Sequence, residues 1–211
     1  MERRGLIVWH CPALLGLLTG LAGITLAADR EADAIAIQEP VIRAVGKSSR
    51  SMFDDVTVLG AIVDRDVVAI SLKSIEGLRD VAVVFADGRR ALPKAIVMLP
   101  DNGFAAISVD CGRSAVRPRQ PQSGDSLQIV RQDGPKENTL VVTSGVVSSK
   151  VRHGFSIDTA VGGQPRSGVV INQERELVGI VVISEKGSLR ALDVQGIRDC
   201  LRERDGAKSS E

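Results

Sequence analysis

Ser167 and His153 are the residues of this 211-residue chain whose side chains best suit nucleophilic chemistry. A serine hydroxyl attacks a carbonyl efficiently only when a base takes its proton and a carboxylate orients that base. His153 lies shortly before Ser167, and the chain's other histidine, His10, belongs to an apolar N-terminal segment. Lys73 is a second candidate base, because a lysine can also activate a serine. Hydrolysis therefore depends on whether one of these bases can reach Ser167.

Cys111 and Cys200 are the other reactive side chains outside the N-terminal segment. They could form a disulfide in an oxidising compartment or remain two free, half-buried thiols, and their spacing favours neither outcome. Neither cysteine lies in a CxxC spacing, and a single histidine beside them cannot complete a zinc site. We therefore expect no metal and no cofactor.

The first 28 residues have the pattern of a signal peptide. A basic start precedes an apolar run from Leu6 to Leu26, and Ala27 and Ala28 supply small residues for cleavage. The alternative is an uncleaved anchor, since the run reaches the lower length limit for spanning a bilayer. Pro12 and several glycines interrupt it and favour cleavage. We expect export to the periplasm, cell envelope or medium, with membrane contact only if residues 1–28 are retained.

Charge and aromatic content exclude several partners. The formal net charge is +1, so the chain as a whole does not attract nucleic acid. Aromatic residues make up 2% of the chain and tyrosine is absent, which leaves few platforms on which bases or sugars could stack.

The remaining sequence predicts strands between two terminal helices. Residues 29 to about 47 show near-helical spacing interrupted at Pro40, and Asp193 is a candidate N-cap for a closing helix over 193–204. The predicted strands are short β-branched runs bounded by Gly, Asp, Asn or Pro. They are Val56–Val63, Val67–Leu72, Val81–Phe85, Ala95–Leu99 and Ala105–Val109, then, after a Pro- and Gln-rich loop at 112–124, Ser126–Arg131, Thr139–Ser148, Phe155–Ile157, Val169–Asn172, Leu177–Ser184 and Leu189–Leu192.

This pattern predicts an all-β domain over 29–205 with about six strands on either side of the loop, followed by a polar tail at 206–211. Regular strand spacing favours a sandwich or barrels over alternating strands and helices. A single ligand-binding barrel of lipocalin type fits the same pattern.

Seven stretches resemble, in order and spacing, blocks of the protease domain of the HtrA (Deg) family of trypsin-like serine proteases. They are Val63–Ala69, Val81–Arg89, Ala105–Asp110, Ser123–Leu127, Thr143–Ser148, Asp158–Val161 and Leu177–Ile180. The resemblance covers about residues 40–205. It implies two six-stranded antiparallel β-barrels of chymotrypsin-type architecture, barrel one at about 48–111 and barrel two at about 125–192. We expect no counterpart of the family's peptide-binding PDZ domain.

The same resemblance places the family's catalytic positions on residues that cannot perform the reaction. The base position falls on Leu72, the orienting carboxylate on Gly103 and the nucleophile on Arg166. A shift of one residue would bring Ser167 onto the nucleophile position. The glycine that helps to form the oxyanion hole is replaced by Gln164, which Pro165 restricts to extended conformations.

The remaining bases are poorly placed to rescue catalysis. His153 is expected on a surface loop of barrel two, whereas the family's base comes from barrel one. Lys73 would face away from Leu72 if the segment were extended. Asp101 lies near the carboxylate position but is best interpreted as a turn aspartate.

We therefore expect an exported, proteolytically inactive homologue of HtrA-type proteases that binds a peptide or protein partner. The strand Leu177–Ile183 is expected to offer an edge for an extended peptide. The expected binding residues are Asp158, Gly162, Gly163, Gln164, Ser167, Val178, Gly179 and Ile180. The resemblance also allows self-association or association with active relatives. The alternatives are an active hydrolase that uses Ser167, and an exported β-barrel with a binding or structural role.

Overall fold

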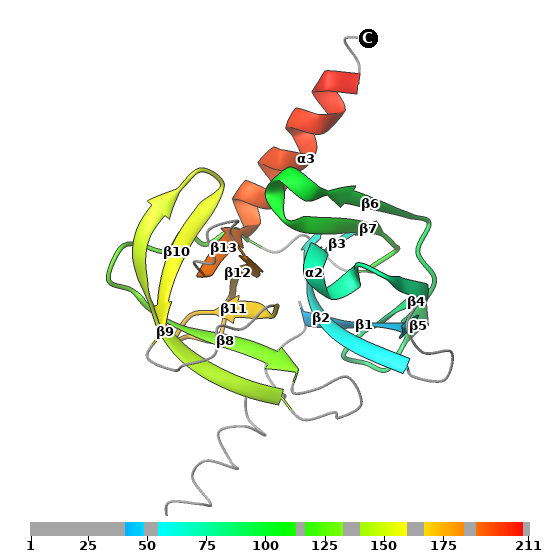
Figure 1. Ribbon diagram of the computed structural model, residues 1–211, viewed down its shortest axis with the longest axis horizontal. Helices are drawn as coiled ribbons and strands as arrows, with labels where there is room; N and C mark the ends of the chain where they lie inside the picture. Colours follow the sequence, from blue (N-terminus) through cyan, green and yellow to red (C-terminus); the bar gives the residue numbers. More distant parts are fainter. Residues whose placement is uncertain are drawn as a thin grey trace, which may run out of the picture.

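β-Branched side chains pack well on a pleated sheet, and the segments rich in them form the strands of this protein. The computed structural model describes residues 41–48, 55–112, 117–132, 140–159, 167–183 and 189–208. Within these ranges the strands form two sheets that lie side by side, and helix α3 (Val194–Lys208) rises from their junction (Figure 1). The other described helical segments are α2 (Leu72–Ile75) and the 3-10 turn Pro100–Asn102. The expected all-β class is confirmed.

Barrel one, expected to have six strands, is an open seven-stranded sheet in the order β5-β4-β1-β2-β3-β7-β6, because β1 and β5 add to the five strand runs expected in this half of the chain. Its strands are β1 (Val41–Ser48), β2 (Asp55–Asp64), β3 (Val67–Ser71), β4 (Leu78–Val84), β5 (Arg90–Ala91), β6 (Ala95–Leu99) and β7 (Phe104–Ser108). Strands β5 and β6 are the two ends of this sheet, and only residues 92–94 separate them in the chain. Because the connection is so short, the two ends of the sheet lie near each other and the sheet curves towards a closed barrel. The interior holds a cluster of buried aliphatic residues that includes Ile42, Ile70 and Ile107.

Strand β1 differs from the sequence-based expectation of a helix over 29–47. Residues 41–48 form a strand whose burial alternates with period two, with Ile42 and Ala44 facing the core. β1 pairs with β2 on one side and β4 on the other. Pairing on both sides satisfies the backbone and overrides the weak helical spacing; residues 29–40 lie outside the described ranges.

Barrel two is a closed six-stranded barrel in the order β10-β13-β12-β11-β8-β9. Its strands are β8 (Ser126–Gln132), β9 (Leu140–Val151), β10 (Gly154–Thr159), β11 (Val169–Ile171), β12 (Leu177–Ile183) and β13 (Leu189–Asp193). Phe155, Ile129 and Val181 belong to the cluster that fills its interior. Closure leaves no free edge along the paired parts of these strands.

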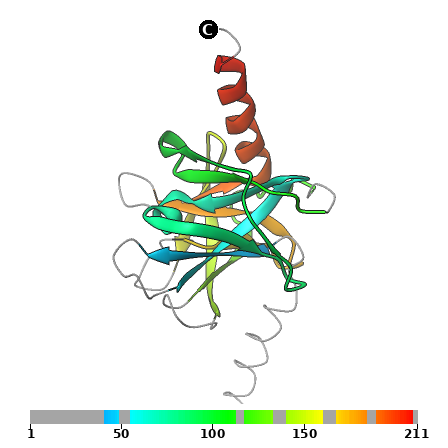
Figure 2. The same ribbon diagram turned by 90° about the vertical axis from the view of Figure 1, so that its right-hand side faces the viewer.

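A third apolar cluster joins the two barrels to each other and to α3. It contains Phe104 and Ala106 from barrel one, Ile180 and Val182 from barrel two, and Ile197 from α3. The helix begins where predicted, because the Asp193 carboxylate accepts a hydrogen bond of 2.6 Å from the Gly196 N–H. The end of α3 stands clear of both barrels (Figure 2). No helix in the described ranges is both long and apolar enough to cross a membrane.

The Arg198 side chain also fastens α3 to barrel one. Its Nε and Nη2 atoms donate to the Val63 carbonyl oxygen at 2.9 and 2.6 Å. Burial raises the pKa of the Asp193 carboxyl above its ordinary value, although the N–H groups of Gly196 and Gln195 act in the opposite direction. Helix α3 is therefore held at its first turn by a cap and one turn later by an arginine.

Candidate functional site

Leu72 and Gly103 lie side by side at one end of barrel one. The β3–β7 ladder ends at the pair Ser71 and Phe104, and Leu72 is the first residue of α2. The Leu72 N–H donates to the Gly103 carbonyl oxygen at 2.9 Å. The structure thus brings together the two positions that the sequence assigned to base and carboxylate. Leu72 was expected at the end of a strand and instead starts a helical turn.

The space beside these two residues is apolar. Gly103 has no side chain and adopts a left-handed backbone conformation, with φ of 75°. A Cβ atom built on it would lie 3.3 Å from the Val182 Cβ of β12. Leu72 packs against the core of barrel one, and Val182 is 2% exposed within the core between the barrels. None of Leu72, Gly103 and Val182 has an ionisable side chain.

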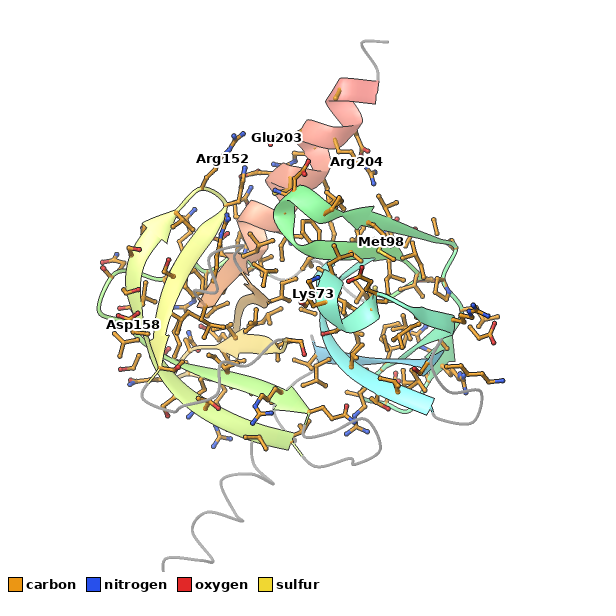
Figure 3. The ribbon with its side chains drawn as sticks, in the orientation of Figure 1. Lys73, Met98, Arg152, Asp158, Glu203 and Arg204 are labelled. Carbon is orange, nitrogen blue, oxygen red and sulfur yellow. The ribbon has the colours of Figure 1, made fainter. Side chains whose placement is uncertain are left out.

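The other candidate bases lie elsewhere. The Lys73 side chain is 67% exposed and forms an ion pair with Glu76 at 3.5 Å, and Figure 3 shows it at α2. His153 occupies the turn between β9 and β10 with φ of 64°. Its side chain is 12% exposed, and its Nε2 lies 3.7 Å from an Oε atom of Glu203 on α3. Lys73 therefore contacts Glu76 at the end of α2, and His153 contacts Glu203 of α3.

Ser167 lies where the chain enters β11, and it is half-buried. The next residue, Gly168, has a positive φ of 146°, and its carbonyl oxygen accepts a hydrogen bond of 2.9 Å from the Val181 N–H. A Cβ atom on Gly168 would lie 2.6 Å from the Val130 carbonyl oxygen. Four expected site residues, Gly162, Gly163, Gln164 and Arg166, lie outside the described residues.

The expected peptide-binding edge is not available at Val178, Gly179 and Ile180. All three residues are buried, and the strand around them pairs with β11 on one side and β13 on the other. Strand β11 begins at Val169, opposite Ile180, so Val182 and Ile183 extend beyond the β11 ladder. Any free edge on this side of β12 therefore begins nearer the C-terminal end of the strand than expected. Sequence patterning cannot detect this, because it does not reveal where a neighbouring strand starts.

Asp158, a further expected binding residue, is exposed on β10. Figure 3 shows it at the outer side of barrel two, far from Lys73 and α2. A groove of about 450 Å³ also lies on barrel two, between the segment Arg119–Leu127 and the turn at Asn172–Glu174. Among the expected binding residues that the structure describes, Val178 alone borders it. The described residues contain no group of three His, Cys, Asp or Glu side chains that could hold a metal ion.

Cys111 and Cys200 are both buried and both free, which answers the question of a disulfide in favour of two thiols. Cys111 belongs to the interior of barrel one, whereas Cys200 packs in the core beneath α3. Burial, with a contribution from Asp66, raises the pKa of the Cys111 thiol to about 11. Burial also raises the pKa of Cys200. Neither thiol has the lowered pKa of a catalytic cysteine.

We expect the two buried thiols to resist alkylation in the folded protein. At pH 8 the thiolate of Cys111 is about 100-fold scarcer than that of a cysteine with an ordinary pKa, and burial blocks the reagent as well. Iodoacetamide labelling followed by peptide mass spectrometry should give modification at both residues only after denaturation. Rapid labelling of native Cys111 would contradict its burial.

A carboxylate restored at position 103 is expected to destabilise the fold. Gly103→Asp places a β-carbon against Val182 on a left-handed backbone and brings a charge next to apolar groups. We expect a loss of about 2–3 kcal/mol in unfolding free energy. Gly88→Asp is the matched control, because Gly88 has φ of 81° and nothing within 4 Å of its Cβ position. Urea denaturation should show a smaller loss for Gly88→Asp, and equal losses would rule out the contact with Val182 as the cause.

Sequence reasoning missed the part that Val182 plays. The residue belongs to the apolar run Val181–Ile183, and such runs indicate burial on both faces of a strand. That signal could have placed Val182 in a core. It could not have identified Gly103 as the partner across the barrel interface.

Neither a protein-family model nor a curated protein sequence matches the chain. Its structure is similar to the crystal structure of the serine endoprotease from Yersinia pestis, with a TM-score of 0.59 and 21% sequence identity. The similarity covers 83% of this chain and 67% of that one. At this level of identity the likeness concerns the fold. The chain therefore has the double-β-barrel fold of trypsin-like serine proteases.

Proposed function

We propose that the chain is a proteolytically inactive relative of HtrA-type serine proteases, exported after removal of residues 1–28, that binds a peptide or protein partner. The observation that carries this proposal is the hydrogen bond between the Leu72 N–H and the Gly103 carbonyl oxygen. It joins the two residues that the family resemblance assigns to the base and carboxylate positions, and neither side chain there can accept or hold a proton.

Inactivity follows from the chemistry of acyl transfer. A serine without a base keeps its proton at neutral pH, and an oxyanion hole alone gives a small residual rate. His153 is engaged with Glu203 on α3, and Lys73 is paired with Glu76 and exposed to solvent. Ser167 is left without an identified base among the described residues.

Binding remains possible because main-chain hydrogen bonds need no catalytic side chain. An extended peptide can add to a free strand edge, and its side chains then provide specificity. Beyond the β11 ladder, β12 continues through the buried Val182 to Ile183, and this end of the strand is the best candidate for such an edge. A second copy of the chain or an active relative is the alternative partner for the same strand edge.

Fluorescein-labelled, unfolded casein tests both halves of this proposal in one measurement. Binding without cleavage should raise the fluorescence polarisation to a stable, saturable value, whereas hydrolysis should lower it with time. A fluorophosphonate probe should leave the chain unlabelled while it labels an active serine protease. Labelling that disappears in Ser167→Ala would overturn the proposal in favour of a working hydrolase. Absence of any polarisation change would remove the binding role.

A further inference from the structure

Strand β6 forms one end of the barrel-one sheet and has a single partner strand. It pairs with β7 from Ala95 to Leu99, and no other described strand pairs with it. An end strand presents unpaired N–H and C=O groups that can accept another chain. Natural proteins often protect such an edge with charged or proline residues, but residues 95–99 are all apolar.

One face of β6 is an exposed apolar surface. Ile96 is 37% exposed and Met98 is 48% exposed. They alternate along the strand and therefore point to the same side of the sheet. Their cross-strand partners on β7, Ile107 and Ala105, belong to the buried core of barrel one. Ile96 and Met98 thus form a solvent-exposed apolar surface at the edge of that core.

The opposite face of β6 borders a pocket of about 320 Å³ beneath α3. Val97 contributes to its floor together with Val67 and Ala106, and Leu201 of α3 contributes from above. Val97 and Met98 are consecutive residues. A strand added to β6 would therefore place alternate side chains on the exposed surface of Ile96 and Met98 and in this pocket.

The pocket carries an excess of positive charge. Arg198, Arg202 and Arg204 of α3 border it, against the two carboxylates of Asp64 and Asp205, and Arg202 also forms an ion pair with Asp199 at 3.2 Å. Arg204 uses Nε and Nη2 to bind Asp205, and its Nη1 is buried without a partner among the described residues. Figure 3 shows Arg204 and Met98 on the same side of α3. Side chains that enter the pocket from an added strand would be favoured if they were acidic.

The same charges disfavour a second copy of this chain as the occupant. Two β6 strands paired antiparallel around a twofold axis would place both α3 helices over the same face of the joined sheet. The arginines of one copy would then approach those of the other. Like charges brought together in this way oppose self-association and leave an acidic peptide as the better match.

We propose that β6 is a docking edge for an extended peptide in which apolar and acidic residues alternate. The apolar residues pack on Ile96 and Met98, and the acidic residues enter the pocket beside Arg202 and Arg204. The site lies on barrel one and α3 and does not depend on the function proposed above.

A fluorescein-labelled hexapeptide of alternating valine and glutamate, acetylated and amidated, is the probe. We expect saturable binding to the full chain by fluorescence anisotropy and slower amide hydrogen exchange at residues 95–99, with no change at Val182 and Ile183. The same peptide with lysine for glutamate, or with proline for valine, should not bind, because the first reverses the charge and the second removes the N–H donors. Binding of the lysine peptide, or protection elsewhere than at β6, would overturn the proposal.

Matched variants separate docking from folding. Ile96→Ser with Met98→Ser should weaken binding about 5- to 20-fold, whereas Val146→Ser, at a residue 44% exposed on β9, should leave it unchanged. Arg204→Gln should weaken binding about fivefold, and Arg152→Gln is its control, because each removes an arginine paired with a carboxylate of α3, but Arg152 does not border the pocket. Equal effects of variant and control would contradict the site. A concentration-dependent dimer lost in the double serine variant would replace the peptide by a second copy.

Discussion

Gly179→Ala is expected to lower the free energy of unfolding by at least about 3 kcal/mol. A Cβ atom on Gly179 would lie 2.0 Å from the Leu192 carbonyl oxygen and 2.9 Å from its carbonyl carbon. These are backbone atoms of β13, which pairs with β12 on one side and β10 on the other. No rotamer change can relieve such a contact, so the two strands must separate and break part of the closed barrel.

Gly206→Ala is the control for this substitution. Gly206 lies within α3 and has nothing within 4 Å of its Cβ position, so alanine there should be neutral or stabilise by up to about 1 kcal/mol. Urea denaturation followed by circular dichroism measures both changes. A loss below about 1 kcal/mol for Gly179→Ala would mean that the spacing of β12 and β13 relaxes at little cost.

The Gly179 result also decides how binding data at this position are interpreted. The sequence suggested Gly179 as a residue of the peptide site, but it is buried between two strands. A binding defect in Gly179→Ala would therefore report a damaged barrel. Substitutions meant to test binding belong at exposed positions, where folding is preserved.

Strand positions were predictable because β-branched runs and turn residues are local signals. The predicted runs Ala95–Leu99 and Leu189–Leu192 match β6 and β13 to within one residue. The helix expected over 29–47 was wrong for residues 41–47, where pairing with β2 and β4 outweighs local spacing. Pairing of this kind depends on distant strands and leaves no local trace in the sequence.

The candidate site was predictable in part. The resemblance to a known family assigned Leu72 to the base position and Gly103 to the carboxylate position, and the structure brings these two residues into hydrogen-bond contact. The point along β12 at which the β11 ladder stops and the state of the cysteines were not predictable. The first depends on where β11 begins, and the second on Cys111 and Cys200 belonging to different clusters. Both are properties of three-dimensional packing.

Phe104→Ala is expected to lower the free energy of unfolding by about 3–5 kcal/mol. Phe104 follows Gly103 directly, is 0% exposed, and belongs to the core shared by the two barrels and α3. Removal of the ring leaves a cavity at the barrel interface, since the ladders of β3 and β6 hold the β7 backbone in place on both sides. Leu92→Ala, at a side chain that is 75% exposed, should cost less than about 0.5 kcal/mol.

The same variant tests whether Phe104 sets the geometry between the barrels. Phe104→Leu keeps most of the apolar volume, so it should recover much of the stability lost in Phe104→Ala. If the ring also positions the end of β12, casein binding should fall more in Phe104→Ala than in a variant of equal stability altered inside one barrel, such as Ile129→Ala. Ile129 is 0% exposed within the barrel-two core and does not belong to the shared cluster. Equal binding by the two variants would mean that Phe104 contributes stability alone, and that the end of β12 keeps its position without the ring.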